Sequence, residues 1–135
     1  MAFSARISGS RDSINDGQSL GFHKTLVFDE ALTNIGSAYN TSNGIFTAPV
    51  SGSYAFFLSQ MAPNGHNSLL LDITKNGVVL DEVFAEGRSD SFDQGSSQVT
   101  THLATGDQVW VRQATGNAVR AGYWTIFTGY LLEAD

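Results

Sequence analysis

The sequence predicts an all-β fold, and three observations carry that prediction. Apolar residues do not recur at the i, i+3, i+4, i+7 spacing of an amphipathic helix over any window of about 11 residues. Short runs of alternating apolar and polar residues recur instead, which is the period of a strand. Clusters of Gly, Asn, Ser and Asp separate roughly eight to ten such runs at near-regular intervals. This pattern is typical of a sandwich, a barrel or a jelly roll.

The first half of the chain contains four segments with strand-like patterns: residues 2–8, 24–29, 45–48 and 52–61. A polar loop over 9–21 follows the first of them, and Pro49 closes the third. The fourth is long and carries aromatic residues on both faces. Alternation places Tyr54 and Phe56 on one face and Phe57 on the other, because successive strand side chains point to opposite sides.

The second half predicts five further strands: residues 68–75, 78–85, 98–104, 108–113 and 123–132. Asn76-Gly77, between the first two, is the strongest short signal for a β-hairpin. Thr105-Gly106-Asp107 predicts a second hairpin by the same reasoning, and residues 86–97, rich in Gly, Ser and Asp, predict a loop. The last strand is apolar on both faces, so we expect neither of its faces to lie against water.

Composition excludes several classes of function. The 135 residues predict one domain over 1–135, and 7 Lys+Arg against 13 Asp+Glu give a net charge of −6, which repels nucleic acid. No apolar run approaches the roughly 20 residues that cross a bilayer, so we expect no membrane insertion. The absence of Cys excludes thiolate nucleophiles and thiolate zinc sites. The chain also lacks hydrolase, zincin and nucleotide-binding motifs, so we expect neither an enzyme nor a cofactor.

A spaced set of residues resembles a known signature: Phe28, Asn34, Tyr39, Phe46, Gly52, Tyr54 and Phe56. It is similar to the signature of the globular head of complement C1q, in the superfamily that also holds the tumour-necrosis-factor ligands. Leu58 stands where that pattern usually carries an aromatic residue, a swap that a core tolerates. Residues 107–111 and 126–132 resemble the family's penultimate and terminal strands. The resemblance covers residues 2–133.

The resemblance implies a ten-stranded jelly-roll β-sandwich with its first and last strands side by side, secreted as a homotrimer. The two-faced apolar strands favour assembly independently, because a monomer would leave one of their faces wet. We therefore expect Phe57, Trp124 and Tyr130 at the trimer interface. Six other aromatic residues are expected in the core: Phe28, Phe46, Tyr54, Phe56, Trp110 and Phe127.

Residues 91–95 resemble the loop with which family members hold calcium. Asp93 would supply one oxygen ligand, with Asp90 as a helper. At a nearby position some members carry a second acid, and this chain has His102, a poor calcium ligand. That departure favours the alternative that Asp93 is an ordinary loop carboxylate. We expect calcium affinity in the millimolar class at most.

The polar loops over 62–67 and 86–90 are the expected ligand-binding segments, since loops on a rigid sandwich commonly carry recognition. Asn64, His66, Arg88 and Asp90 offer hydrogen bonds to sugar hydroxyls and, through Arg88, to a carboxylate. Each could instead be a solvated loop residue. The expected function is that of a soluble, lectin-like innate-immune protein that binds microbial or host glycans or lipopolysaccharide. The alternative is a protein ligand for a cell-surface receptor or synaptic partner.

One further motif stands apart from these sites. Asn40-Thr41-Ser42 matches the acceptor pattern for N-glycosylation. The pattern is easily met by chance and has meaning only for a secreted chain.

Overall fold

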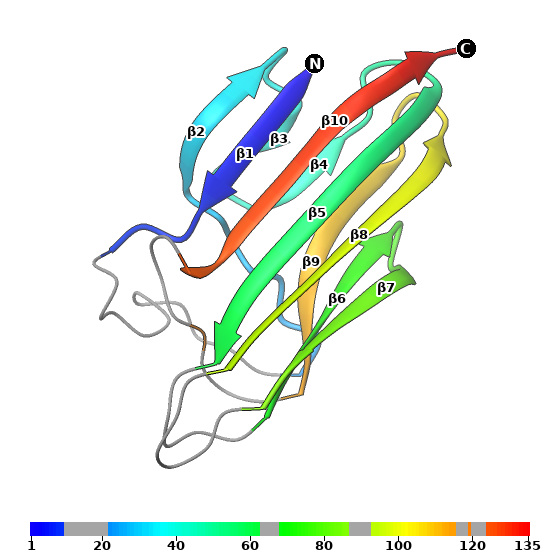
Figure 1. Ribbon diagram of the computed structural model, residues 1–135. Helices are drawn as coiled ribbons and strands as arrows, with labels where there is room; N and C mark the ends of the chain where they lie inside the picture. Colours follow the sequence, from blue (N-terminus) through cyan, green and yellow to red (C-terminus); the bar gives the residue numbers. More distant parts are fainter. Residues whose placement is uncertain (10–21, 63–67, 87–92, 116–118, 120–123) are drawn as a thin grey trace.

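The computed structural model describes residues 1–9, 22–62, 68–86, 93–115, 119 and 124–135. These residues form two antiparallel sheets that pack face to face (Figure 1). The first sheet contains, in spatial order, β2 (Glu30–Ile35), β1 (Ala2–Arg6), β10 (Ile126–Ala134), β5 (Gly52–Ala62) and β8 (Asp93–Leu103). The second contains β3 (Tyr39–Asn40), β4 (Ile45–Thr47), β9 (Gln108–Thr115), β6 (Leu69–Lys75) and β7 (Val78–Ala85). The all-β jelly-roll prediction is confirmed.

The last strand lies at the centre of the first sheet. β10 is the middle strand of the first sheet, hydrogen-bonded to β1 on one side and to β5 on the other. The first and last strands are therefore side by side, as the resemblance implies. The N- and C-termini meet at one end of the sandwich (Figure 1), and the Leu131 amide donates to the Met1 carbonyl at 3.3 Å.

Aromatic side chains fill the space between the sheets. Phe56 lies 5.4 Å from Phe46 and 6.0 Å from Phe127, measured between ring centroids, and Phe3 lies 5.1 Å from Phe127. All four are fully buried. Gly129 of β10 lies among these rings. A Cβ atom at this position would come within 2.6 Å of the Phe3 ring and 2.7 Å of the Phe56 ring, which is too close for any side chain. The glycine thus lets both rings pack directly against the backbone of β10.

Five of the six aromatic residues expected in the core are buried, and Trp110 is the exception. Its neighbours Val109 and Val111 point inward, so alternation along β9 places Trp110 on the outer face, where it is half-buried. The ring lies near Gly77 of the adjacent turn. The prediction was wrong because alternation along the strand, and not the apolar character of tryptophan, decides which face the side chain occupies.

The Asn76-Gly77 hairpin is confirmed. Both residues have positive φ, 50° and 86°, as a type I′ turn requires, and Lys75 pairs with Val78. The second predicted hairpin is wrong, because β8 and β9 belong to different sheets. The turn between them is held by another segment: the Gly106 amide donates to the Ala48 carbonyl at 2.8 Å. Turn residues specify a reversal but do not say which sheet the next strand joins.

Two strand boundaries also differ from expectation. The expected strand over 24–29 is wrong, because these residues contribute only an isolated bridge between Thr25 and Arg112. Residues 30–35 form the edge strand β2 instead, which is mostly exposed and so shows little alternation. β8 begins at Asp93 within the predicted loop, because its eleven residues pair continuously with β5 from Ala62 to Gly52. Backbone pairing with a long neighbour outweighs the low strand propensity of Gly and Ser there.

Candidate functional site

The outward side of the first sheet carries an apolar and neutral surface, here called the uncharged face. Strand pairing places on it Ala55, Phe57, Ser59, Ser96, Gln98, Thr100, Ile126, Thr128 and Tyr130. The rings of Phe57 and Tyr130 stack at its centre, with centroids 5.8 Å apart and planes inclined by 17°. Both side chains are half-buried in the single chain. An aromatic pair held in this way is preorganised for contact with another molecule.

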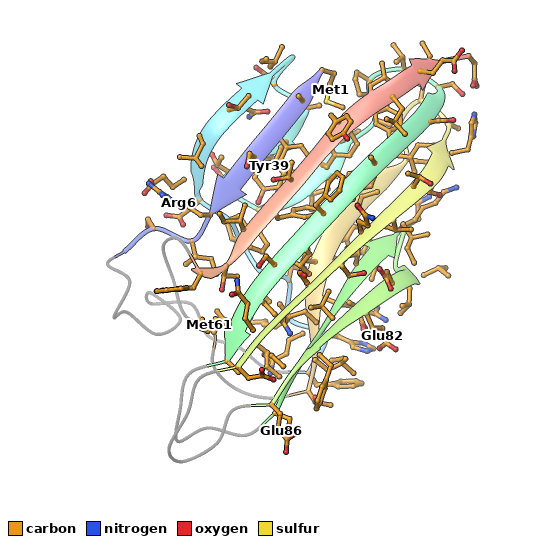
Figure 2. All side chains as sticks on the ribbon, in the orientation of Figure 1. Met1, Arg6, Tyr39, Met61, Glu82 and Glu86 are labelled. Atoms are coloured by element: carbon orange, nitrogen blue, oxygen red, sulfur yellow. The ribbon has the colours of Figure 1, made fainter. Side chains whose placement is uncertain are left out.

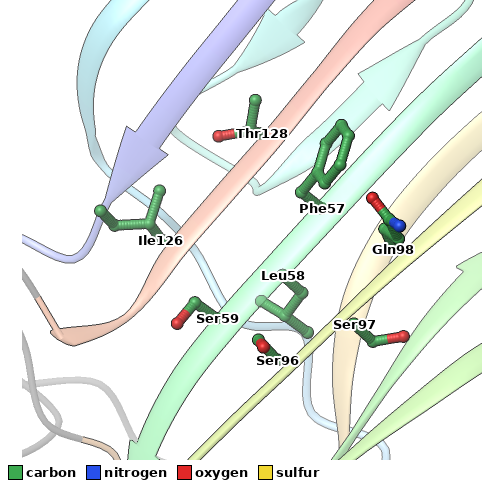
Figure 3. Close-up of a pocket in the computed structure, with 8 residues that line it drawn as sticks. All are labelled: Phe57, Leu58, Ser59, Ser96, Ser97, Gln98, Ile126 and Thr128. Carbon is green, nitrogen blue, oxygen red and sulfur yellow. The ribbon is translucent and has the colours of Figure 1, made fainter.

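Two shallow depressions flank Phe57. One, of about 510 Å³, is shown in Figure 3, where Phe57, Gln98, Thr128 and Ile126 surround it with neighbouring serines. The other, of about 400 Å³, lies on the side of Tyr130 and Leu132. All the lining residues of both are uncharged. The chemistry of this surface suits burial against a protein face rather than capture of an ion.

Two polar interactions lie at the β1 edge of the uncharged face. Ser4 and Thr128 share a hydrogen bond of 2.9 Å between their hydroxyls. Arg6 forms an ion pair with Glu30 of the edge strand, with Nη2 2.6 Å from Oε1. These two charges compensate each other, which lowers the cost of burying this part of the margin.

Trp124, expected on the same strand face, lies before the first residue of β10 rather than within it. It is half-buried, and its Nε1 atom is buried without a hydrogen-bond partner among the described residues. The adjacent Thr125 hydroxyl accepts from the Met61 amide at 3.4 Å. This contact ties the start of β10 to the end of β5. A role for Trp124 in assembly stays a prediction.

The four predicted ligand-binding residues, Asn64, His66, Arg88 and Asp90, lie outside the described residues. Their flanking strand ends do lie together: Ala62 pairs with Asp93, and Leu69 pairs with Ala85. Figure 2 shows Met61 and Glu86 at this end of the sandwich, which is here called the loop end. The described strand ends that flank 63–67 and 87–92 in the sequence therefore lie at the loop end.

Asp93, the predicted calcium ligand, is exposed at the loop end. Its Oδ2 accepts a hydrogen bond from the Glu86 amide at 2.7 Å, so the carboxylate closes the segment between β7 and β8. The described residues contain no group of three side chains suited to hold a metal ion. Calcium requires six to eight oxygen ligands, so residues within 87–92 would have to supply most of them. The described residues alone do not form a calcium site.

His102 does not lie near Asp93. The two residues occupy opposite ends of β8, about 30 Å apart at the rise of an extended strand. His102 Nε2 lies 2.8 Å from Asp135 Oδ2, which also accepts from the Ser51 hydroxyl at 2.6 Å. These hydrogen bonds from Ser51 and His102 hold the pKa of Asp135 below its ordinary value. His102 therefore anchors the C-terminus and has no bearing on calcium at residues 91–95.

Sequence reasoning missed a charged cluster on the outward side of the second sheet. Arg112 Nε donates to Asp72 Oδ2 at 3.2 Å, and Asp72 pairs across the sheet with Glu82. Hydrogen bonding and repulsion by Asp72 raise the pKa of Glu82. A β-bulge between Ile73 and Thr74 brings Asp72 opposite Glu82. Without that bulge, the Asn76-Gly77 turn would pair Asp72 with Asp81.

Among the described residues, no helix has the length and apolar character needed to cross a membrane. The two packed antiparallel sheets define a jelly-roll β-sandwich. The C1q domain family model matches residues 2–132, so the chain belongs to the C1q domain family. Domains of this family are non-enzymatic ligand-binding modules of the C1q/tumour-necrosis-factor superfamily.

Two curated relatives are each 30% identical to this chain over the aligned residues. The chain is 30% identical to Caprin-2 of Danio rerio over 112 residues, which cover 82% of this chain and 12% of that protein. It is 30% identical to complement C1q tumor necrosis factor-related protein 3 of Homo sapiens over 109 residues, covering 79% and 44% respectively. The chain thus spans less than half the length of these relatives.

Solved structures share the fold over nearly the whole chain. The globular domain of zebrafish complement 1qA protein superposes with a TM-score of 0.79 at 18% identity, covering 99% of this chain and 98% of that one. Murine APRIL at pH 5.0 gives 0.75 at 14% identity, with coverage of 97% and 98%. The Eiger TNF of S. frugiperda gives 0.73 at 10% identity, with coverage of 100% and 96%.

Proposed function

We propose that this chain is the subunit of a secreted, homotrimeric, lectin-like protein of innate immunity. It binds microbial or host glycans or lipopolysaccharide through the segments at its loop end. The observation that supports this proposal is the pairing of Ala62 with Asp93 and of Leu69 with Ala85. These paired residues are the described strand ends that flank the polar segments 63–67 and 87–92 in the sequence. Recognition residues are commonly carried in this way.

The side chains of these segments match the chemistry of a saccharide. Asn64, His66 and Asp90 provide donors and acceptors for hydroxyl groups, and Arg88 provides a bidentate donor for the carboxylate of an acidic sugar or for a phosphate of lipopolysaccharide. Each hydrogen bond to a sugar replaces one to water and has a net contribution of about 0.5–1.5 kcal/mol, more where a charged group takes part, so we expect modest affinity at each site. A trimer would repeat the site three times.

The uncharged face supports the trimer. Three copies carry 3 × −6 = −18 charges, and this repulsion opposes association wherever acidic surfaces approach. The residues around Phe57 and Tyr130 bear no charge, so they can be buried without a desolvation penalty for ions. Aromatic residues are also enriched at interfaces. We assign the trimer contact to Phe57, Tyr130 and, at the start of β10, Trp124.

A protein receptor is the second candidate partner, and one observation favours it. Phe84 of β7 is 56% exposed, and Val78 on the same edge strand is 71% exposed. Exposed apolar residues on a sheet edge suit contact with a protein more than contact with a sugar. Capture of a partner from cell-surface extract in the presence of excess monosaccharide separates the candidates, because a protein contact would survive the sugar.

We expect substitution of Arg88 or His66 by alanine to weaken glycan or lipopolysaccharide binding at least tenfold. A charge-assisted hydrogen bond contributes about 1.5–3 kcal/mol, and 1.4 kcal/mol corresponds to tenfold in affinity. A glycan array followed by titration calorimetry measures the change. Lys75→Ala is the charge-matched control, since Lys75 pairs with Asp107 at the far end of β6 and should leave binding unchanged. Wild-type protein that binds no glycan and no lipopolysaccharide, with or without calcium, would refute the lectin assignment.

Calcium binding is expected to be weak, with a dissociation constant in the millimolar range of extracellular modules. Asp93→Asn should abolish it while preserving an oxygen that can accept from the Glu86 amide. Calorimetric titration of chelator-treated protein measures both. Submicromolar affinity in the wild type would show that residues 87–92 complete a strong site. Unchanged affinity in Asp93→Asn would place calcium elsewhere.

A further inference from the structure

Asn40 occupies the only position in the sequence where an asparagine is followed, two residues later, by Ser or Thr with no intervening Pro. We propose that Asn40 is an N-glycosylation site of this protein. The proposal rests on the proposed secretion of the chain, because the modification requires passage through a secretory compartment. The proposal does not depend on the proposed glycan-binding residues at the loop end. Asn40 would carry a covalently attached sugar, whereas those residues would bind a sugar without forming a covalent bond.

The local geometry leaves the acceptor atom available. Asn40 is the last residue of β3 and is exposed. Its side-chain Oδ1 accepts a hydrogen bond from the Ser42 amide at 2.8 Å, and its carbonyl accepts from the Gly44 amide at 2.9 Å. Its Nδ2 makes no hydrogen bond within the part of the chain that the structure describes. Attachment at Nδ2 therefore breaks none of the described contacts.

The turn that presents Asn40 is firmly held. Gly44 has a φ of +78°, and a Cβ atom there would approach the Leu26 carbonyl oxygen to 2.5 Å, so only glycine fits. Asn43 closes the turn, with its Oδ1 accepting from the Ile45 amide at 2.9 Å. Asn43 is as exposed as Asn40 but has Ile45 where the acceptor pattern needs Ser or Thr. The same turn thus contains an acceptor and a matched non-acceptor.

The surroundings can accommodate an attached sugar. Asn40 borders an open depression of about 340 Å³ whose polar lining includes Ser37, Asn43, Thr47 and Gln108. These side chains offer hydroxyl and amide groups to a saccharide. β3 is the edge strand of the second sheet, whereas Phe57 and Tyr130 lie on the outward side of the first. A glycan at Asn40 therefore leaves the uncharged face free for assembly.

The chemical step is a glycosyl transfer from a lipid-pyrophosphate-linked oligosaccharide, which the secretory compartment supplies. Asn40 Nδ2 forms a bond to the anomeric carbon of the first sugar and loses one proton. The bond from that carbon to the pyrophosphate oxygen breaks, and the lipid pyrophosphate leaves with the bonding electrons. No oxidation or reduction occurs. The transfer takes place during synthesis, so the exposed final position of Asn40 permits the modified chain to fold.

The test expresses the full chain behind a cleavable secretory leader in a eukaryotic cell and measures its intact mass in cells and in the medium. We expect the wild type to carry one oligosaccharide, which an N-glycan-specific amidase removes while converting Asn40 to Asp. Asn40→Gln and Ser42→Ala should both lack it, and Ser42→Thr should retain it. Asn43→Gln is the matched control and should be modified like the wild type.

A wild-type chain with only its unmodified mass of 14.5 kDa in both fractions would overturn the proposal. So would a glycan that persists in Asn40→Gln. The mass of the protein inside the cells is measured as well, because the oligosaccharide is transferred before export. The test therefore stays valid if export is slow. Failure of the lectin assignment is separate: a chain that carries the glycan at Asn40 but binds no saccharide refutes the proposed function and leaves this inference standing.

Discussion

Replacing Phe56 with alanine is expected to lower the free energy of unfolding by about 3–5 kcal/mol, the range for a fully buried phenylalanine. The ring is 0% exposed and lies in contact with Phe46, Tyr54 and Phe127. Its loss would leave a cavity between rings that other core residues already hold in place. Urea denaturation followed by tryptophan fluorescence measures the change as a lower midpoint with an unchanged slope.

Phe57→Ala is the matched control, since it removes the same ring from the opposite face of the same strand. Measured on dissociated protein, it should cost far less, because Phe57 is only half-buried in the single chain. An equal loss of stability in the two variants would contradict the assignment of Phe56 to the core and Phe57 to the outward face.

Phe57→Glu is expected to convert the assembly into monomers. The wild type should have a mass of 3 × 14.5 = 43.5 kDa by light scattering, and the variant a mass near 14.5 kDa. The physical reason is that three carboxylates would be buried at the centre of an uncharged interface without cationic partners, each at a cost of several kcal/mol. The far-ultraviolet circular dichroism spectrum should stay that of a β-protein.

Phe84→Glu is the control for this experiment. It introduces the same charge at an exposed phenylalanine on β7 of the other sheet and should leave the trimer intact. Two results would contradict the proposal: a wild-type mass near one chain at micromolar concentration, or dissociation by Phe84→Glu together with an intact Phe57→Glu trimer. The second result would move the interface to the β7 edge.

The sequence predicts strands well where one periodic face is buried and poorly where neither face is. β5 and β7 were predicted to within a residue, because inward and outward positions differ sharply or because Asn76-Gly77 fixes the register. β2 escaped prediction because most of its residues are exposed. The turn at Gly106 was recognised as a reversal, but its role as a corner between sheets depends on the distant Ala48 carbonyl.

Some features of the candidate site could be predicted from the sequence, and others depend on how the strands pair. The sequence predicts Phe57, Trp124 and Tyr130 on outward strand faces; the structure places Phe57 and Tyr130 there, stacked through the pairing of β5 with β10, whereas Trp124 lies before β10 begins. The cluster of Asp72, Glu82 and Arg112 could not be predicted, because a bulge shifts the register by one residue. The expected proximity of His102 to Asp93 failed because both belong to the same uninterrupted strand of eleven residues, with eight residues between them.

Both ends of the chain lie at the end of the sandwich opposite the loop end. This arrangement affects the avidity that a trimer would have. Copies related by a rotation axis point the same way, so a trimer would present three loop ends toward one surface and three pairs of termini away from it. Any sequence attached at either terminus would leave from the far side without obstructing that surface. If the proposed trimer binds a repetitive target through one site, the other sites would experience a millimolar effective concentration of ligand, which would raise overall affinity by about 10²–10⁴. Weak individual sites would then discriminate dense, repeating surfaces from isolated sugars in solution.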